Sequence, residues 1–284
     1  MLGRLRRTAV AVAVVVVCAL AFVGSRVVHR TGHDTGGTPD AYLSSASKRA
    51  RHLEDIPGKV YRNIVGGLEQ YERDRTLGPP YRTLARGDKD RKQIALTFDD
   101  GPHPAYTPQL LAILKRANVK ATFFVVGELA AKHPDLIRAE IAAGHNVGNH
   151  TFHHVNLTKI PLDRVNTEIV TCGKVLQQIT GKRPDLFRPP GGNFNRKVAA
   201  IATNLGYTSV LWTDDPADYA DPGEHAITYR TLRDLDNGCI ILLHDGSAET
   251  LHLLPRLLRS LKAMGWQFVT VEQMIASSSG RPAG

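Results

Sequence analysis

From Gln93 onward, short apolar runs typical of β-strands alternate with amphipathic runs typical of α-helices. The strand-like run 94–98 (IALTF) precedes the helix-like run 107–117 (TPQLLAILKRA), and the alternation continues to about residue 275. Strands that alternate with helices form βα units, which assemble into a parallel sheet or barrel. About seven strands are expected, fewer than the eight of a complete TIM barrel. The pattern therefore favours a reduced or distorted barrel, with a doubly wound open sheet as the alternative.

The N-terminus has the pattern of a targeting segment. Three arginines within 4–7 precede an uncharged apolar run from about Ala9 to Gly24. Such a pattern is typical of a signal peptide or, if uncleaved, of a membrane anchor slightly shorter than the ~20 residues that span a bilayer. Either alternative places the body of the protein outside the cytoplasm.

The domain boundaries follow from these changes in composition. We expect a signal peptide or signal-anchor transmembrane helix over 1–25, and a linker or stalk, partly helical, over 26–91. One folded α/β domain is expected over 92–276, with a flexible tail over 277–284.

The basic charge of the chain does not indicate a nucleic-acid partner. The formal net charge is +9, but the position of the charges matters more than their sum. From residue 92 onward positive and negative residues are nearly matched, and no basic stripe is interleaved with aromatic residues. Much of the excess precedes residue 52, at Arg4, Arg6, Arg7, Arg26, Arg30, Lys48, Arg49 and Arg51.

The three cysteines do not form a disulfide framework. Cys18 belongs to the apolar leader, Cys172 lies on the apolar face of a predicted helix, and Cys239 begins the strand-like run CIILLHD. A bridge between Cys172 and Cys239 is the alternative, but two separate buried thiols are favoured because free cysteine behaves as a small apolar residue.

Polar residues gather where the predicted strands end. In parallel β/α folds the carboxyl ends of the strands form the active site, so a functional site is expected there. The residues concerned are Asp99, Asp100, His150, His154, Arg188, Asp215, Asp218, His244 and Asp245.

Two of these histidines have a spacing found in metal sites. His150 and His154 are four residues apart, which can place both imidazoles on one helical turn. A histidine pair alone is more often a surface or capping feature, and the adjacent Asp99 and Asp100 alone could be a solvated turn. Together, two histidines and an aspartate suit Zn²⁺ with one position left open. His145 and His153 are not included in this set.

Five ordered motifs carry a resemblance to a known family. They are TFDDGP (97–102), HTFHH (150–154), RPPGG (188–192), DPADY (215–219) and LLHD (242–245). Over about 92–275 the chain resembles the polysaccharide deacetylases of carbohydrate esterase family 4, the NodB-homology domain. The resemblance implies a distorted (β/α)7 barrel and a divalent metal, usually zinc.

The resemblance also implies a role for each matching residue. Asp99 would be the general base, oriented by Arg188. Asp100, His150 and His154 would hold the metal.

His244 would be the general acid, with its pKa tuned upward by Asp218. Gly191 would contribute a backbone N–H to the oxyanion, and Leu243 and Tyr219 would line the pocket for the acetyl methyl group. The chain has Gly191 where the family often has an aromatic residue, and Tyr219 where it usually has tryptophan. These departures bear on specificity more than on activity.

The resulting functional hypothesis is a metal-dependent deacetylase, secreted or membrane-anchored, that acts on an extracellular N-acetylhexosamine polysaccharide, with peptidoglycan as the favoured substrate. The alternatives within the family are chitooligosaccharides and the O-acetyl groups of acetylxylan. A catalytically inactive polysaccharide-binding module lies outside it. A glycosidase is disfavoured, because its two carboxyl groups flank the scissile bond about 5–10 Å apart and Asp99 and Asp100 are adjacent.

Overall fold

The computed structural model describes residues 80–278. The expected leader or anchor over 1–25 lies outside the described residues, as do most of the stalk and of the C-terminal tail. Strand β1 (Thr83–Leu84) pairs with β6 (Thr208–Val210), so the sheet includes residues from the segment expected to be a stalk. Among residues 80–278, no helix is both long and apolar enough to cross a membrane.

Strands and helices alternate along the described chain as the sequence predicts. The remaining strands are β2 (Gln93–Gly101), β3 (Thr122–Val125), β4 (Asn146–Asn149), β5 (Leu186–Phe187), β7 (Cys239–His244) and β8 (Gln267–Phe268). The helices are α4 (Thr107–Arg116), α5 (Gly127–Lys132), α6 (Pro134–Ala142), α7 (Leu162–Thr180), α8 (Arg196–Asn204), α9 (Glu224–Asp234), α10 (Ala248–Ala263) and α11 (Val271–Ser278), with 3₁₀ turns η1 (Leu157–Lys159), η2 (Pro190–Gly192) and η3 (Asp218–Ala220).

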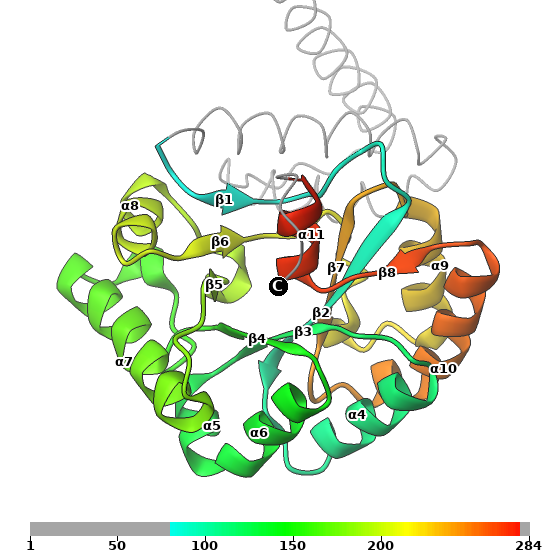
Figure 1. Ribbon diagram of the computed structural model, residues 1–284, viewed down its shortest axis with the longest axis horizontal. Coiled ribbons are helices and arrows are strands. Elements are labelled where there is room, and N and C mark those ends of the chain that lie inside the picture. The colour runs from blue at the N-terminus through cyan, green and yellow to red at the C-terminus, as the bar shows by residue number, and fades with distance from the viewer. Residues whose placement is uncertain (1–79, 279–284) are drawn as a thin grey trace, which may run out of the picture. The chain divides into compact units, whose positions relative to one another are not determined.

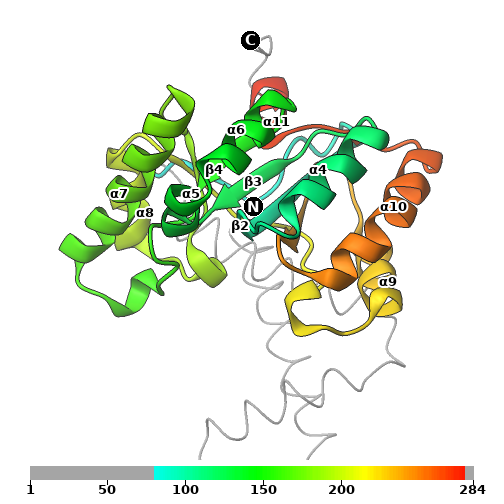
Figure 2. The same ribbon diagram turned by 90° about the horizontal axis from the view of Figure 1, so that it is seen from below.

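All strand pairs in the sheet are parallel. The order is β1-β6-β5-β4-β3-β2-β7, and β8 pairs with β2. Beyond β6, the backbone N–H of Leu242 donates to the carbonyl oxygen of Asp214 at 2.9 Å, and Asp214 forms a parallel bridge with Ile241. The β6 side of the sheet is thereby linked to β7. Figures 1 and 2 show helices α4 to α10 arranged around the outside of the strands.

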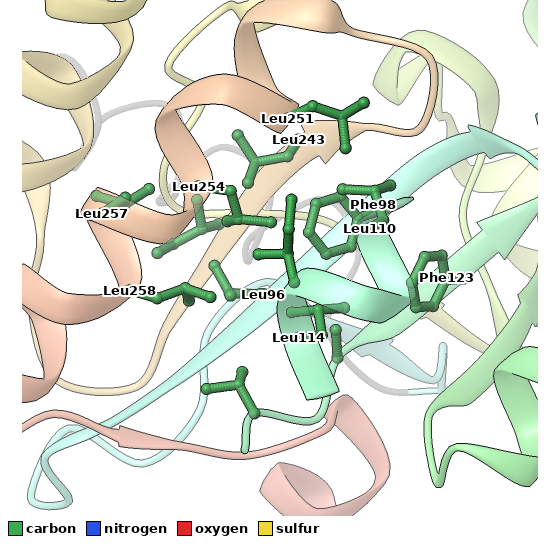
Figure 3. Packing of buried hydrophobic residues seen from close by; sticks show 14 of the residues in the cluster. Leu96, Phe98, Leu110, Leu114, Phe123, Leu243, Leu251, Leu254, Leu257 and Leu258 are labelled. Carbon is green, nitrogen blue, oxygen red and sulfur yellow. The ribbon is translucent and has the colours of Figure 1, made fainter. Parts of the chain in front are cut away.

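The central strands are buried on both sides, as parallel strands covered by helices should be. All four residues of β3 are buried, and seven of the nine residues of β2 form one continuous buried run. Alternate residues of β2 and β7 face the helices. Phe98 of β2 and Leu243 of β7 belong to the same apolar cluster as Leu254 of α10 (Figure 3). The opposite face of β2 and β7 is therefore available for Asp99 and His244, which are partners in the strand register.

Helix α7 buries an apolar face that includes Val165, Ile169, Cys172 and Leu176. Cys172 and Cys239 are both buried and free, as the sequence predicts. Burial raises the pKa of each thiol to about 12. Both cysteines are therefore unreactive core residues.

Candidate active site

Three potential metal ligands converge at the carboxyl ends of β2 and β4. Asp100 Oδ1 lies 3.3 Å from His150 Nε2 and 3.0 Å from His154 Nε2. These ligand atoms all lie within 4.8 Å of one another. The predicted set of Asp100, His150 and His154 is thus brought together around one point.

The chemistry of these atoms fits a bound cation. His150 Nδ1 lies 2.8 Å from the carbonyl oxygen of Arg188 and donates its proton to it, which leaves a lone pair on Nε2 when the ring is neutral. That lone pair faces carboxylate oxygens of Asp99, at 3.7 Å, and of Asp100. Asp100 Oδ1 is buried without a hydrogen-bond partner among residues 80–278. Electron-pair donors that converge in this way form a set that suits a divalent cation.

The histidines reach this point from an irregular loop and not from one helical turn. His150 directly follows β4, and the next residues up to η1 have no regular secondary structure. Thr151 and His154 have φ of +68° and +54°, and Asp100 has φ of +70°. This left-handed conformation is uncommon for residues other than glycine. The two histidines named from their spacing do converge, but the backbone that brings them together is held by tertiary contacts.

Asp99 is fixed by a buried arginine. It is 3% exposed, and its Oδ1 accepts a hydrogen bond from Arg188 Nη1 at 2.7 Å. Arg188 is fully buried and its guanidinium also donates to Thr97 Oγ1 and to backbone carbonyls, while it stacks on Phe124 at 4.1 Å. A hydrogen bond of this kind restricts the orientation of the Asp99 carboxyl group.

His244 is paired with a buried aspartate at the end of β7. Its Nδ1 lies 2.7 Å from Asp218 Oδ1, and its backbone N–H donates to Asp218 Oδ2 at 2.8 Å. Thr250 Oγ1 donates to the same Oδ2. Burial alone lowers the pKa of His244, but the hydrogen bond and charge of Asp218, with the charges of Asp99 and Asp100, outweigh burial and raise it. The pKa of His244 is thus shifted in the direction that favours a proton donor.

Several known proteins are similar to this chain. A family profile described as "Polysaccharide deacetylase" matches residues 86–210. The chain is 39% identical over 191 residues to a peptidoglycan-N-acetylglucosamine deacetylase of Bacillus cereus, covering 66% of this chain and 89% of that protein. It is 38% identical to the deacetylase PgdA of Listeria monocytogenes, covering 66% of this chain but only 39% of the relative.

The solved structure of the Bc1960 peptidoglycan N-acetylglucosamine deacetylase superimposes with a TM-score of 0.67 at 33% identity, covering 68% of this chain and 92% of that chain. The chain belongs to the polysaccharide deacetylase family. As a member of this family it is a hydrolase that acts on carbon–nitrogen bonds, and the resemblance seen in its five motifs is confirmed.

Of the three residues expected to contact the acetyl group, Tyr219 lies beside His244, Gly191 lies close after Arg188, and Leu243 lies away from the site. The Tyr219 ring, 60% exposed, meets the His244 ring edge-on with centroids 5.3 Å apart. Gly191 lies in η2, three residues after Arg188, with φ of +60°. The structure does not bring Leu243 to the site, because it is fully buried in the apolar cluster against the helices.

Leu242 occupies the face expected of Leu243. Side chains alternate along a strand, so residue 242 shares a face with His244 and residue 243 does not. Leu242 is 3% exposed and belongs to none of the buried apolar clusters. Counting back by two from His244 would have selected Leu242 from the sequence.

Two supporting residues were missed by the sequence reasoning. Asn149 accepts a hydrogen bond from the N–H of Thr151 through Oδ1. Glu168, on α7, accepts from the backbone N–H groups of Phe152 and His153. A signal for Glu168 existed, since this acidic residue lies on the apolar face of a predicted helix, three residues after Val165. Asn149 offered none, because a polar residue at a strand end is common.

Proposed function

We propose that the protein is an N-deacetylase that hydrolyses the acetamido groups of an N-acetylhexosamine polysaccharide, with peptidoglycan as its substrate. The observation that carries the proposal is the arrangement of two distinct groups on neighbouring strands. The buried base Asp99 lies near the carboxyl end of β2 beside the ligand set, and His244 ends β7 with its side chain hydrogen-bonded to Asp218. The names of the similar proteins support the choice of peptidoglycan.

Asp99 supplies the base for the attack of water on the acetyl carbonyl. Its Oδ2 is the carboxylate oxygen nearer to the ligand set, while Oδ1 is held by Arg188. It takes a proton from the water as the new carbon–oxygen bond forms. A zinc ion bound by Asp100, His150 and His154 would polarise the carbonyl and lower the pKa of water. The backbone N–H of Gly191 would add a hydrogen bond to the oxyanion.

His244 completes the reaction from the other strand. An amine is a poor leaving group, so the nitrogen must receive a proton as the carbon–nitrogen bond breaks. The raised pKa of His244, caused mainly by Asp218 acting against burial, supports this role. The products are acetate and a free amino group on the sugar. Leu242 and Tyr219 would contact the acetyl methyl group.

The test is acetate release by the full chain from peptidoglycan, from chitooligosaccharides and from acetylxylan. We expect release from peptidoglycan that is lost after treatment with a chelator and restored by Zn²⁺. Acetylxylan tests the O-acetyl alternative, and chitooligosaccharides test the choice between N-acetylated polymers.

Two results would overturn this assignment. Activity that survives complete removal of metal would contradict the mechanism. Binding of peptidoglycan without acetate release from any of the three polymers, in the zinc-loaded protein, would indicate an inactive binding module instead.

We also propose a distorted (β/α)7 barrel and an extracytoplasmic location. The link between β6 and β7 through Asp214 supports a closed ring of strands. The basic and apolar N-terminal sequence supports export, either as a cleaved peptide or as an anchor. N-terminal sequencing of protein from the membrane and secreted fractions distinguishes these two forms.

A further inference from the structure

The loop that carries both histidine ligands has an unfavourable backbone conformation. Thr151 and His154, neither of which is glycine, have positive φ. Such conformations persist only where the surrounding structure imposes them. The position of the two Nε2 atoms therefore depends on what holds residues 151–154.

Part of the answer lies within the loop and its neighbours. Thr151 Oγ1 accepts a hydrogen bond from the N–H of His154 at 3.1 Å. The carbonyl oxygens of Thr151 and Phe152 accept from the N–H groups of Gly127 and Glu128 at the start of α5. These bonds satisfy the carbonyl groups at 151 and 152, but they leave the N–H groups at 152 and 153 to another partner.

That partner is a single buried carboxylate on α7. Glu168 is 2% exposed, and its Oε2 accepts from the N–H groups of Phe152 at 3.1 Å and His153 at 2.8 Å. Its Oε1 lies 2.8 Å from His153 Nδ1. Among residues 80–278, every hydrogen bond of this buried group goes to Phe152 or His153, which lie between the two histidines.

We propose that Glu168 is a positioning residue that clamps the backbone of the ligand loop and so preorganises His150 and His154 for the metal. This inference rests on the metal centre of the proposed function. The two amide bonds form the clamp, and the contact with the His153 ring is secondary, because that ring is half-exposed and exposed pairs contribute little. Groups that support metal ligands typically affect metal affinity about 10–100-fold.

The experiment measures Zn²⁺ affinity by chelator competition in the metal-free full chain, without reference to catalysis. Glu168→Met removes the acceptor at similar side-chain length, and we expect about tenfold or greater weakening. Glu168→Gln retains a carbonyl oxygen for both amides and should bind within about threefold of the wild type. His153→Ala, which leaves both amide bonds intact, should also bind nearly normally.

Glu140→Met is the matched control. Glu140 is also a fully buried glutamate on a helix, but it has no hydrogen bond to the ligand loop. The Glu140→Met substitution should leave Zn²⁺ affinity unchanged. Hydrogen exchange provides a second readout: the amides of Phe152 and His153 should be protected in the wild type and in Glu168→Gln, and exposed in a folded Glu168→Met variant.

Three outcomes would overturn the clamp. One is unchanged Zn²⁺ affinity in Glu168→Met, and another is equal loss in Glu168→Gln and Glu168→Met. The third is rapid exchange of both amides in the wild type. In each case the metal centre itself would stand. Zn²⁺ affinity that is insensitive to Asp100→Asn would instead overturn the metal centre, and the clamp with it.

Discussion

Asp99 and Asp100 are adjacent in the chain but occupy different environments. Asp99 continues the strand register, opposite His244, and its carboxylate contacts Arg188. The register of β2 with β3 shifts between Asp99 and Gly101, and Asp100 adopts a left-handed conformation between them. This local irregularity lets two consecutive carboxylates point toward one site, whereas consecutive residues of a regular strand point to opposite faces.

Asp99→Asn should separate proton transfer from metal binding. Asparagine preserves the size of the side chain and an oxygen for Arg188, but it cannot act as a base at neutral pH. We expect kcat/KM for acetate release to fall about 10²–10⁴-fold. The Zn²⁺ content of the purified variant, measured by elemental analysis, should equal that of the wild type. If kcat/KM of Asp99→Asn stays within tenfold of the wild-type value, Asp99 is not the general base.

Asp218→Asn should change the pH dependence of the reaction through His244. Burial lowers the pKa of His244, and the ionised Asp218 is the main group that raises it. Asparagine retains the shape but removes the charge, so the pKa of His244 should fall. A general acid works only below its pKa, so activity is lost at lower pH than in the wild type.

The measurement is kcat/KM from pH 5 to 9, which reports the free enzyme. The alkaline limb of the profile should move toward lower pH in Asp218→Asn. Tyr219→Phe serves as the control, since it alters a neighbour of His244 without removing a carboxylate. An unmoved alkaline limb would show that His244 is not the group titrating there.

At the scale of whole elements, α6 buries an acid that the reaction does not use. Glu140 is fully buried, and neither carboxylate oxygen has a hydrogen-bond partner among the described residues. Burial, with a smaller effect of the charge of Asp245, raises the pKa of Glu140 well above its usual value. The group is therefore neutral in the folded protein at pH values where the unfolded chain is ionised.

Glu140→Gln should remove a pH-dependent loss of stability. Between the unfolded pKa, near 4.5, and the higher folded pKa, the folded state binds the extra proton. The free energy of unfolding consequently falls as pH rises, by about 1.4 kcal/mol per pH unit from this group. Between pH 5 and pH 8 the free energy of unfolding, measured with urea, should therefore fall less in Glu140→Gln than in the wild type. A constant difference between the two proteins would show that Glu140 is ionised in the fold.

The order of the elements was predictable from the sequence, and their fine placement was less so. Apolar periodicity predicts the alternation from β2 to α11 because each buried face must be apolar. It gives no sign of β1, whose two residues, Thr83 and Leu84, form no apolar run. The prediction for Leu243 is wrong, because adjacent strand residues point to opposite faces and Leu242 is the residue that shares a face with His244.

The sequence indicates several residues of the candidate site but not the backbone conformation that holds them. His150 and His154 stand out by their spacing and by their position after a predicted strand, whereas the choice of Asp100 over Asp99 as the third ligand rests on the family resemblance. The loop that joins the histidines could not be predicted, since its left-handed residues depend on Asn149, on α5 and on Glu168. The contact with Asn149 is local, whereas the contacts with α5 and with Glu168 join the loop to separate helices, whose placement the sequence of the loop does not predict.

At the scale of the whole molecule, the candidate metal site joins strands that are not neighbours in the sheet. Asp100 belongs to β2, and the histidines follow β4, with β3 between them. The three ligand atoms are close together only in the folded protein, so the unfolded chain would not bind the cation at this site. Metal binding should therefore stabilise the folded protein by mass action.

We expect removal of Zn²⁺ to lower the melting temperature of the wild type by about 5–10 °C. Zinc at 100 times its dissociation constant contributes about 2.7 kcal/mol, and each kcal/mol shifts the melting temperature of a domain of this size by about 2–4 °C. The measurement is calorimetry of the full chain with zinc and with a chelator.

Asp100→Asn is the matched control, because asparagine tolerates the left-handed backbone at this position but is a weaker ligand. Its melting temperature should respond little to zinc, and should lie near that of the metal-free wild type. Equal stabilisation of the two proteins would mean that zinc binds outside the set formed by Asp100, His150 and His154. A response confined to the wild type would show that β2 and the segment after β4 are joined through the metal.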